Sequence, residues 1–177
     1  MEELSEIKIG SMLRSSGIKL VTAESCTGGL IGHRLTNVSG SSDYYLGGII
    51  AYAYEAKVAL LDVSWDTLQK YGAVSRETVL EMARGARKKL GADISVSVSG
   101  IAGPGGGLPG KPVGTTWFGL AANDGEWARV FCFAGDREKN KSDSAEAALQ
   151  LVLDYLTGNR ALDADLRRQI NSGDLSK

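Results

Sequence analysis

A run of small polar residues and glycines follows a short apolar stretch near the start of the sequence. The apolar stretch, residues 19–23, predicts a buried strand, and the run Glu24-Ser-Cys-Thr-Gly-Gly29 comes directly after it. Such residues favour the first turn of a helix. A serine at a strand-to-helix turn is either a helix N-cap or a nucleophile whose neighbouring N–H groups stabilise an oxyanion. The local sequence leaves both interpretations of Ser25 open.

A serine nucleophile needs a base, and histidine is scarce in this chain. The single histidine, His33, falls in a predicted helix and reads as a surface or packing residue, so a Ser-His-Asp triad is disfavoured. Lysine is a known alternative base when burial or a positive field lowers its pKa. Lys57 lies near the start of a predicted helix over residues 55–61, where the helix dipole supplies such a field. Its alternative interpretation is a solvent-exposed helix lysine.

Three more segments combine an apolar strand with a glycine-rich or polar turn. They are Gly47-Gly-Ile-Ile-Ala-Tyr-Ala-Tyr-Glu-Ala-Lys57, Ser99-Gly-Ile-Ala-Gly-Pro-Gly-Gly-Gly107 and Phe133-Ala-Gly-Asp-Arg137. Ligand sites of open α/β sheets gather outside the strand ends. We therefore expect these three segments and the Ser25 segment to converge on one site.

The glycine-rich segment and Arg137 have the composition of an anion site. Residues 103–107 are typical of a nest whose successive N–H groups point at one oxygen cluster. The segment lacks the Lys-Ser/Thr ending of a Walker loop, which disfavours ATP. Arg137 offers a planar donor fork suited to phosphate. The alternatives are a flexible surface loop and a surface ion pair of Arg137 with Asp136 or Glu138.

Composition excludes several classes of protein. The chain has 177 residues, 43% hydrophobic and 23% charged, with a net charge of −1, which gives no electrostatic case for binding nucleic acid or an anionic membrane. Two cysteines make no disulfide framework or metal site. No apolar run has membrane-spanning length, and we recognise no signal peptide. We expect a cytoplasmic protein without a metal or cofactor.

The pattern of apolar residues predicts one α/β domain over residues 1–158, with a mixed β-sheet, helices on both faces and a late antiparallel hairpin. Residues 159–177 read as a polar tail with one weak amphipathic helix. The predicted helices are 2–15, one starting at Ser25, 55–61, 64–69, one capped by Ser75, and one marked by Ala148, Leu151, Val152 and Tyr155. The predicted strands are 19–23, 44–54 with a bulge or close contact at Gly47-Gly48, 94–98, 115–121 and 127–133.

The same four segments, together with Gly72-Ala-Val-Ser75 and Lys111-Pro-Val-Gly114, carry a resemblance to a known family. The chain resembles the C-terminal domain of the competence-damage-inducible protein A family, the nicotinamide-nucleotide amidases, over residues 5–156. The combination is highly specific, although each motif alone is weak. The N-terminal domain of the longer members is not in this sequence, and the segment after Gly158 lies outside the resemblance.

The resemblance implies hydrolysis of the carboxamide of nicotinamide mononucleotide, with lysine in place of histidine as the base. By motif, Ser25 is the nucleophile, Lys57 the base, Tyr52 a hydroxyl in their hydrogen-bond network, and Arg137 a ligand of the substrate phosphate. The other expected substrate contacts are Glu24, Cys26, Thr27, Gly28, Gly48, Gly103, Gly105 and Gly106. The alternatives are a non-catalytic nucleotide- or partner-binding module and an amidase for another amide. The strand aromatics and the tail also lead us to expect a homo-oligomer.

Overall fold

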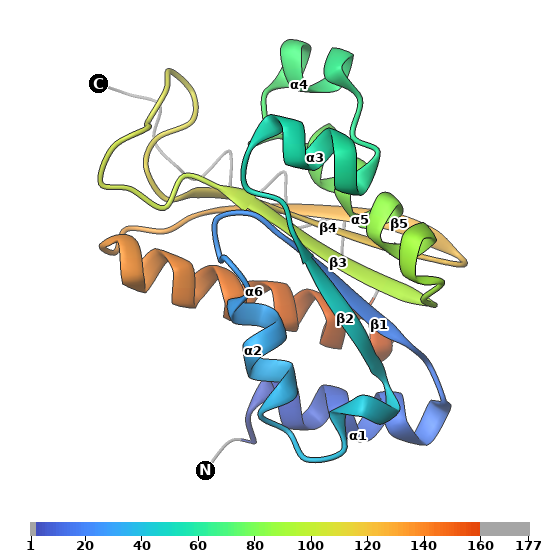
Figure 1. Cartoon of the computed structure of the whole chain (residues 1–177). Coiled ribbons are helices and arrows are strands. Elements are labelled where there is room, and N and C mark those ends of the chain that lie inside the picture. Colours follow the sequence, from blue (N-terminus) through green and yellow to red (C-terminus); the bar gives the residue numbers. More distant parts are fainter. Residues whose placement is uncertain (1–2, 160–177) are drawn as a thin grey trace.

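A five-stranded mixed sheet forms the centre of the chain, which a computed structural model describes for residues 3–159 (Figure 1). Along the sheet the order is β2-β1-β3-β4-β5. The first three strands are parallel, whereas β4 is antiparallel to both of its neighbours. The strands are β1 Leu20–Glu24, β2 Tyr45–Ile50, β3 Ile94–Gly100, β4 Thr115–Ala122 and β5 Gly125–Cys132. The predicted mixed sheet and its late hairpin are confirmed.

Helices cover both faces of this sheet, as the sequence predicted. On one face lie α1, α2 and α6, and on the other lie α3, α4 and α5 (Figure 1). The helices are α1 Ser5–Ser16, α2 Leu30–Thr36, α3 Tyr54–Leu61, α4 Trp65–Tyr71, α5 Arg76–Leu90 and α6 Arg137–Leu156, with a 3-10 turn η1 at Ser41–Asp43. Ser64 and Ser75 cap α4 and α5 by accepting hydrogen bonds from Asp66 N and Thr78 N.

The serine face of β3 packs against a helix instead of facing solvent. Ser95 and Ser97 are fully buried and donate hydrogen bonds to the main-chain carbonyls of Ala83 and Val79 in α5. Small hydroxyl side chains let the helix backbone come close while their own polar atoms stay paired. The alternation over 94–98 therefore reflects two buried faces.

The polar and glycine-rich segments all leave the sheet at one edge. The carboxyl ends of β1, β2 and β3 meet there because these strands are parallel. Two antiparallel steps make β5 run in the same direction as β3, so the segment after β5 emerges at that edge too. The predicted convergence of the four segments is confirmed.

Three predicted boundaries are wrong. α2 begins at Leu30 and not at Ser25, and β2 ends at Ile50, four residues before the predicted end. α6 begins at Arg137, well before Ala148, the first apolar residue that marked it. The apolar pattern missed this start because the first half of α6 buries small and polar side chains. The predicted bulge in β2 is confirmed by a register shift opposite Leu20 and Val21. The helix predicted within 159–177 lies outside the described residues.

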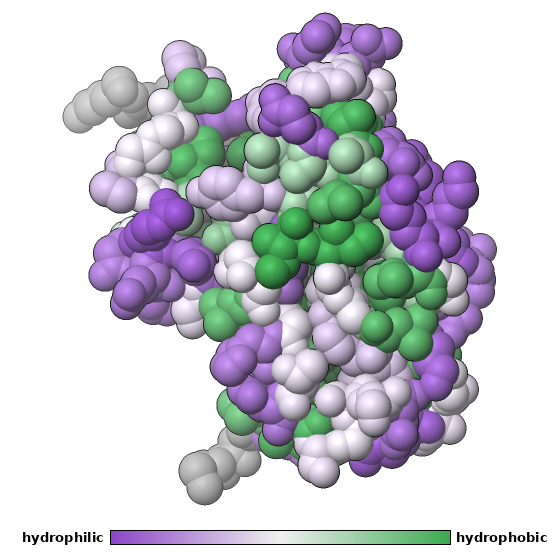
Figure 2. Space-filling model, in the orientation of Figure 1, coloured by the Kyte–Doolittle hydropathy of each residue, from purple (hydrophilic) through white to green (hydrophobic). Residues whose placement is uncertain are grey.

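The surface over β2 and α3 is apolar. Figure 2 shows hydrophobic residues gathered over the end of β2 and over α3. The large apolar side chains exposed on these elements are Leu46, Ile50, Tyr54 and Leu60. Within residues 3–159, none of the helices is both long and apolar enough to cross a membrane.

Candidate active site

A buried lysine and a buried serine meet at the sheet edge. Lys57, on α3, is fully buried, and its Nζ lies 2.9 Å from Ser25 Oγ, directly after β1. The same nitrogen donates to the main-chain carbonyls of Ala51 (2.9 Å) and Tyr52 (2.8 Å). β2 and β1 are parallel neighbours, so the chain that leaves β2 brings Lys57 back to the end of β1. The Ser25 and Lys57 side chains predicted to act together are thus in contact.

Burial changes the acid–base behaviour of Lys57. Loss of hydration lowers its pKa from the ordinary value to about 8, and the neighbouring Cys26 thiol opposes this weakly. The structure gives Lys57 no carboxylate partner among residues 3–159. Burial, more than the helix start suggested by the sequence, is the cause of the shift. The amine is therefore partly neutral near neutral pH.

The turn that carries Ser25 is held by the carboxylate of Glu24. Glu24 Oε2 accepts from Gly29 N (2.9 Å), Ile31 N (3.2 Å) and Thr27 Oγ1 (2.7 Å). Its Oε1 accepts from Gly32 N at 2.9 Å. The carboxylate thereby supplies the N-terminal capping of α2, since Gly29 at the N-cap has no side chain to do so.

These contacts decide two points about Ser25. Ser25 is not the N-cap of the helix, because α2 begins at Leu30 with Gly29 as its N-cap, and the Ser25 N–H donates to Val98 O of β3 at 3.1 Å. The N–H groups at the start of α2 are not free for an oxyanion, because Glu24 already binds them. Glu24 is itself buried, and both of its oxygens are occupied by the turn. These contacts give Glu24 the role of shaping the turn. They explain why it is buried without a contact to the substrate.

Tyr52 lies at the site but not as predicted. Its main-chain carbonyl, and not its hydroxyl, accepts the hydrogen bond from Lys57. The side chain is 64% exposed, and its hydroxyl lies 3.5 Å from Arg137 Nη2. The strand ends at Ile50, so the backbone at Tyr52 turns its carbonyl inwards and its side chain outwards. The hydroxyl therefore borders the opening of the site.

Arg137 joins the glycine-rich loop to the start of α6. Its Nη1 donates to Gly103 O at 2.7 Å, and within the described part of the chain it makes no ion pair. Asp136 instead caps α6 by accepting from Lys139 N. The alternative of a surface ion pair of Arg137 with Asp136 or Glu138 is thus contradicted.

The predicted glycines differ in what requires them. Gly28 and Gly106 have φ of +63° and +90°, a conformation that other residues rarely adopt. A Cβ on Gly48, within β2, would lie 2.4 Å from Thr22 Oγ1, and one on Gly103 would lie 2.6 Å from Val113 Cγ1. Gly105 is exposed and has open space around it. Packing explains Gly48, whereas Gly105 and Gly106 leave room at the surface.

The thiol beside Ser25 is not a competing nucleophile. Cys26 is buried, and burial raises its pKa to about 11. A thiol that stays protonated is a poor nucleophile. Within residues 3–159 no group of three His, Cys, Asp or Glu side chains is arranged to hold a metal ion.

Sequence reasoning missed Asn140. This side chain on α6 is 1% exposed and bonds to main-chain groups of two loops at the site edge. An asparagine in a polar stretch that the apolar pattern assigned to no element carries no sequence signal of its own. Only the placement of α6 against the loops makes it visible.

Comparison with known proteins assigns the family. The family model for the CinA C-terminal domain matches residues 2–156. A "CinA-like protein" of Chloroherpeton thalassium is 48% identical over 158 residues, 87% of this chain and 38% of that relative. The chain thus spans a little over a third of the length of such curated relatives. A "Nicotinamide-nucleotide amidohydrolase PncC" of Enterobacter agglomerans is 48% identical over 157 residues, 86% of this chain and 93% of that protein.

Solved structures agree with this assignment. A crystal structure of a CinA superfamily protein from Escherichia coli has a TM-score of 0.83 and 34% identity, covering 85% of this chain and 88% of that one. A competence/damage-inducible protein from Agrobacterium tumefaciens has a TM-score of 0.80 and 35% identity, covering 89% and 99%. The chain belongs to the CinA C-terminal domain family.

Proposed function

We propose that the protein hydrolyses the carboxamide of nicotinamide mononucleotide to nicotinate mononucleotide and ammonia, using Ser25 as the nucleophile and Lys57 as the base. The observation that carries this proposal is the 2.9 Å contact between Lys57 Nζ and Ser25 Oγ in a buried site. The PncC relative, which this chain matches over nearly its whole length, supports the substrate.

The three partners of Lys57 suit both protonation states of its amine. In the charged form the three N–H groups donate to Ser25 Oγ and to the carbonyls of Ala51 and Tyr52. When the amine loses a proton, the two carbonyls keep the two remaining N–H groups, and the lone pair faces Ser25 Oγ. Two fixed acceptors therefore orient the base towards the hydroxyl proton.

The reaction then proceeds in two halves. Lys57 takes the Ser25 proton while Oγ attacks the carboxamide carbon, and the resulting tetrahedral intermediate expels the amide nitrogen. The protonated Lys57 gives its proton to that nitrogen, which leaves as ammonia, and an acyl ester remains on Ser25. Lys57 next takes a proton from a water whose oxygen attacks the ester carbon. The ester C–O bond then breaks, and the protonated Lys57 returns its proton to Ser25 Oγ. The acid that is released ionises to the carboxylate by losing a proton to solvent.

The oxyanion of the intermediate needs donors close to Ser25. The N–H groups of Cys26 and Thr27 are the two in this turn that no carbonyl or carboxylate of residues 3–159 accepts. An N–H directly after the nucleophile serves this purpose in other strand-to-helix nucleophile turns. We assign these two groups to the oxyanion.

The phosphate belongs at the other side of the opening, near Arg137. One half of its guanidinium is held by Gly103 O, while the other half lies beside the Tyr52 hydroxyl at the surface. The N–H groups of Gly105 and Gly106, two exposed residues of the loop, complete the expected anion site. The same site disfavours substrates that lack a phosphate.

Ammonia release from nicotinamide mononucleotide by the purified protein tests the proposal. We expect turnover with one nicotinate mononucleotide formed per ammonia, and a lower kcat/KM for nicotinamide riboside, because energy from binding a remote phosphate also acts at the reacting centre. Binding of the mononucleotide without turnover would support the non-catalytic module. Turnover of another amide but not of this one would move the enzyme to a different substrate.

Two expectations from the sequence stay predictions. A homo-oligomer agrees with an edge strand, β2, that exposes Leu46 and Ile50, and sedimentation of the purified chain would test it. A cytoplasmic location is the other.

A further inference from the structure

Asn140 fastens the glycine-rich loop to the segment that precedes α6. Its Nδ2 donates to Ala102 O at 3.1 Å, and its Oδ1 accepts from Gly135 N at 3.0 Å. Both partners are main-chain groups. The Asn140 side chain is only 1% exposed, so water does not readily replace these two hydrogen bonds. The Asn140 carboxamide thus joins two segments of the chain. Its partners, Ala102 and Gly135, are 33 residues apart in the sequence.

Asn140 and Arg137 act on neighbouring carbonyls of the loop. They are three residues apart on α6, so they share one face of the helix. Arg137 donates to Gly103 O. Asn140 donates to the carbonyl oxygen of Ala102, the residue before Gly103. Asn140 therefore fixes the distance between the loop and the helix turn from which Arg137 extends.

We propose that Asn140 is a positioning residue for the anion end of the substrate: it sets the glycine-rich loop against Arg137 so that both reach one phosphate. This inference rests on the proposed function for its substrate. It does not involve Ser25 or Lys57, which lie on other elements. Loss of Asn140 therefore weakens recognition of the phosphate and leaves turnover of a substrate without a phosphate unchanged.

Two substitutions separate this role from general stability. Asn140→Asp keeps the shape and the acceptor for Gly135 N but turns an acceptor towards Ala102 O, whereas Asn140→Ala removes both hydrogen bonds. Ser144→Ala is the matched control, because Ser144 is equally buried one turn further along α6. Its hydroxyl contacts Asn140 O within the helix and Thr116 Oγ1, and neither loop backbone.

The first readout is the preference for nicotinamide mononucleotide over nicotinamide riboside. For Asn140→Asp and Asn140→Ala we expect kcat/KM for the mononucleotide to fall about tenfold, the size of one lost buried hydrogen bond. For the riboside we expect kcat/KM to stay within about twofold of wild type, since it lacks the phosphate. Ser144→Ala should keep the wild-type ratio. An equal fall for both substrates, or no fall, would overturn the proposal.

The second readout does not depend on catalysis. Hydrogen–deuterium exchange of the free protein should be faster across residues 101–107 in both Asn140 variants than in wild type and Ser144→Ala. Unchanged exchange there would contradict the positioning role. A wild-type protein that is inactive on the mononucleotide would instead contradict the proposed function, and the exchange result would still decide the role of Asn140.

Discussion

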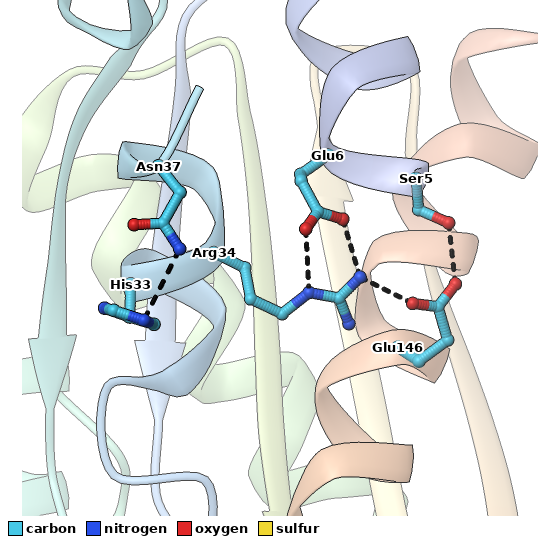
Figure 3. A network of polar contacts seen from close by, with 6 residues as sticks. All are labelled: Ser5, Glu6, His33, Arg34, Asn37 and Glu146. Atoms are coloured by element: carbon cyan, nitrogen blue, oxygen red, sulfur yellow. Dashed lines mark hydrogen bonds and ion pairs between the residues drawn. The ribbon is translucent and has the colours of Figure 1, made fainter. Parts of the chain in front are cut away.

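Two cations in this protein, the fully buried Lys57 and the partly buried Arg34, have opposite surroundings. Lys57 lies at the sheet edge with a hydroxyl and two carbonyls around it. Arg34, on the opposite face of the sheet from α3, lies between the carboxylates of Glu6 and Glu146 (Figure 3). Comparing the two shows how surroundings decide whether a buried cation keeps its charge.

The Arg34 cluster ties three helices together. Arg34 of α2 binds Glu6 of α1 through two hydrogen bonds, at 3.2 and 2.6 Å, and Glu146 of α6 at 2.6 Å. Ser5 donates to the other oxygen of Glu146, as Figure 3 shows. His33 projects away from this cluster towards Asn37 on the exposed side of α2, which confirms it as a surface residue.

Burial acts on both cations, but only the arginine has anions to oppose it. Burial alone would lower the pKa of Arg34, yet the hydrogen bonds that Arg34 donates to Glu6 and Glu146, together with their negative charges, outweigh it and raise that pKa. Burial would raise the pKa of Glu6, and Arg34 lowers it overall. No carboxylate of residues 3–159 pairs with Lys57, so burial prevails there and its pKa falls to about 8. The paired cation holds the fold together, and the unpaired one is available as a base.

The largest effect should come from removing the partner of Lys57. We expect Ser25→Ala to lower kcat by about 10⁴-fold or more, the scale seen when a serine nucleophile is lost. Its melting temperature should stay close to wild type, because the hydroxyl bonds only to Lys57 within the described residues. Turnover within a few-fold of wild type would end the nucleophile assignment.

The next largest effect should come from a substitution that keeps the side chain at position 57 positively charged at every pH. Lys57→Arg keeps a positive charge but cannot lose its proton, so kcat should fall by about 10³-fold. Lys57→Met removes the charge at similar length and should be equally inactive. Circular dichroism of both variants checks that they fold. An active arginine variant would mean that Lys57 is only an electrostatic contact and that Ser25 takes its base from elsewhere.

The smallest effect on turnover should come from breaking the ion pair between Arg34 and Glu6. Glu6→Gln leaves Arg34 with one carboxylate, and we expect the free energy of unfolding to fall by about 2 kcal/mol at pH 7. Glu6 and Arg34 side chains are only 10% and 18% exposed, so solvent does little to replace the pair. Urea unfolding measures the loss, and kcat/KM should stay within about twofold.

The pH dependence of that loss follows from the lowered pKa of Glu6. A carboxyl whose pKa is lower in the folded state adds stability above its unfolded pKa, ordinarily 4.5, and this stability disappears as the pH falls through the folded value. The difference between wild type and Glu6→Gln should therefore shrink in acid. A difference that is the same at pH 7 and pH 3 would contradict the comparison.

Much of the fold was predictable because the apolar pattern is regular where strands and helices are buried. The strand 94–98, the hairpin at 123–125 and the Ser75 cap follow from local sequence. The start of α6 was not predictable in this way. Its first half buries Asn140 and Ser144, whose polar side chains find partners only in the folded chain.

The site was predictable in its residues more than in its contacts. Ser25 and Lys57 were identified by their match to the motifs of the family, and the scarcity of histidine agrees with a lysine base. The parallel strands bring the two side chains together. The role of Glu24 was not predictable, because its side chain binds N–H groups five to eight residues further along the chain. A helix capped by Ser25 would have the same local sequence. The inward carbonyl of Tyr52 depends on where β2 ends.

The central claim is that Lys57 is neutral enough to act as a base in the free enzyme. The pH profile of kcat/KM for nicotinamide mononucleotide tests it most directly, because it reports the pKa of the free enzyme's base. We predict an ascending limb with an apparent pKa of about 8, well below the ordinary lysine value of 10.5. An ascending limb near 10.5, or no limb between pH 6 and 10, would contradict the account.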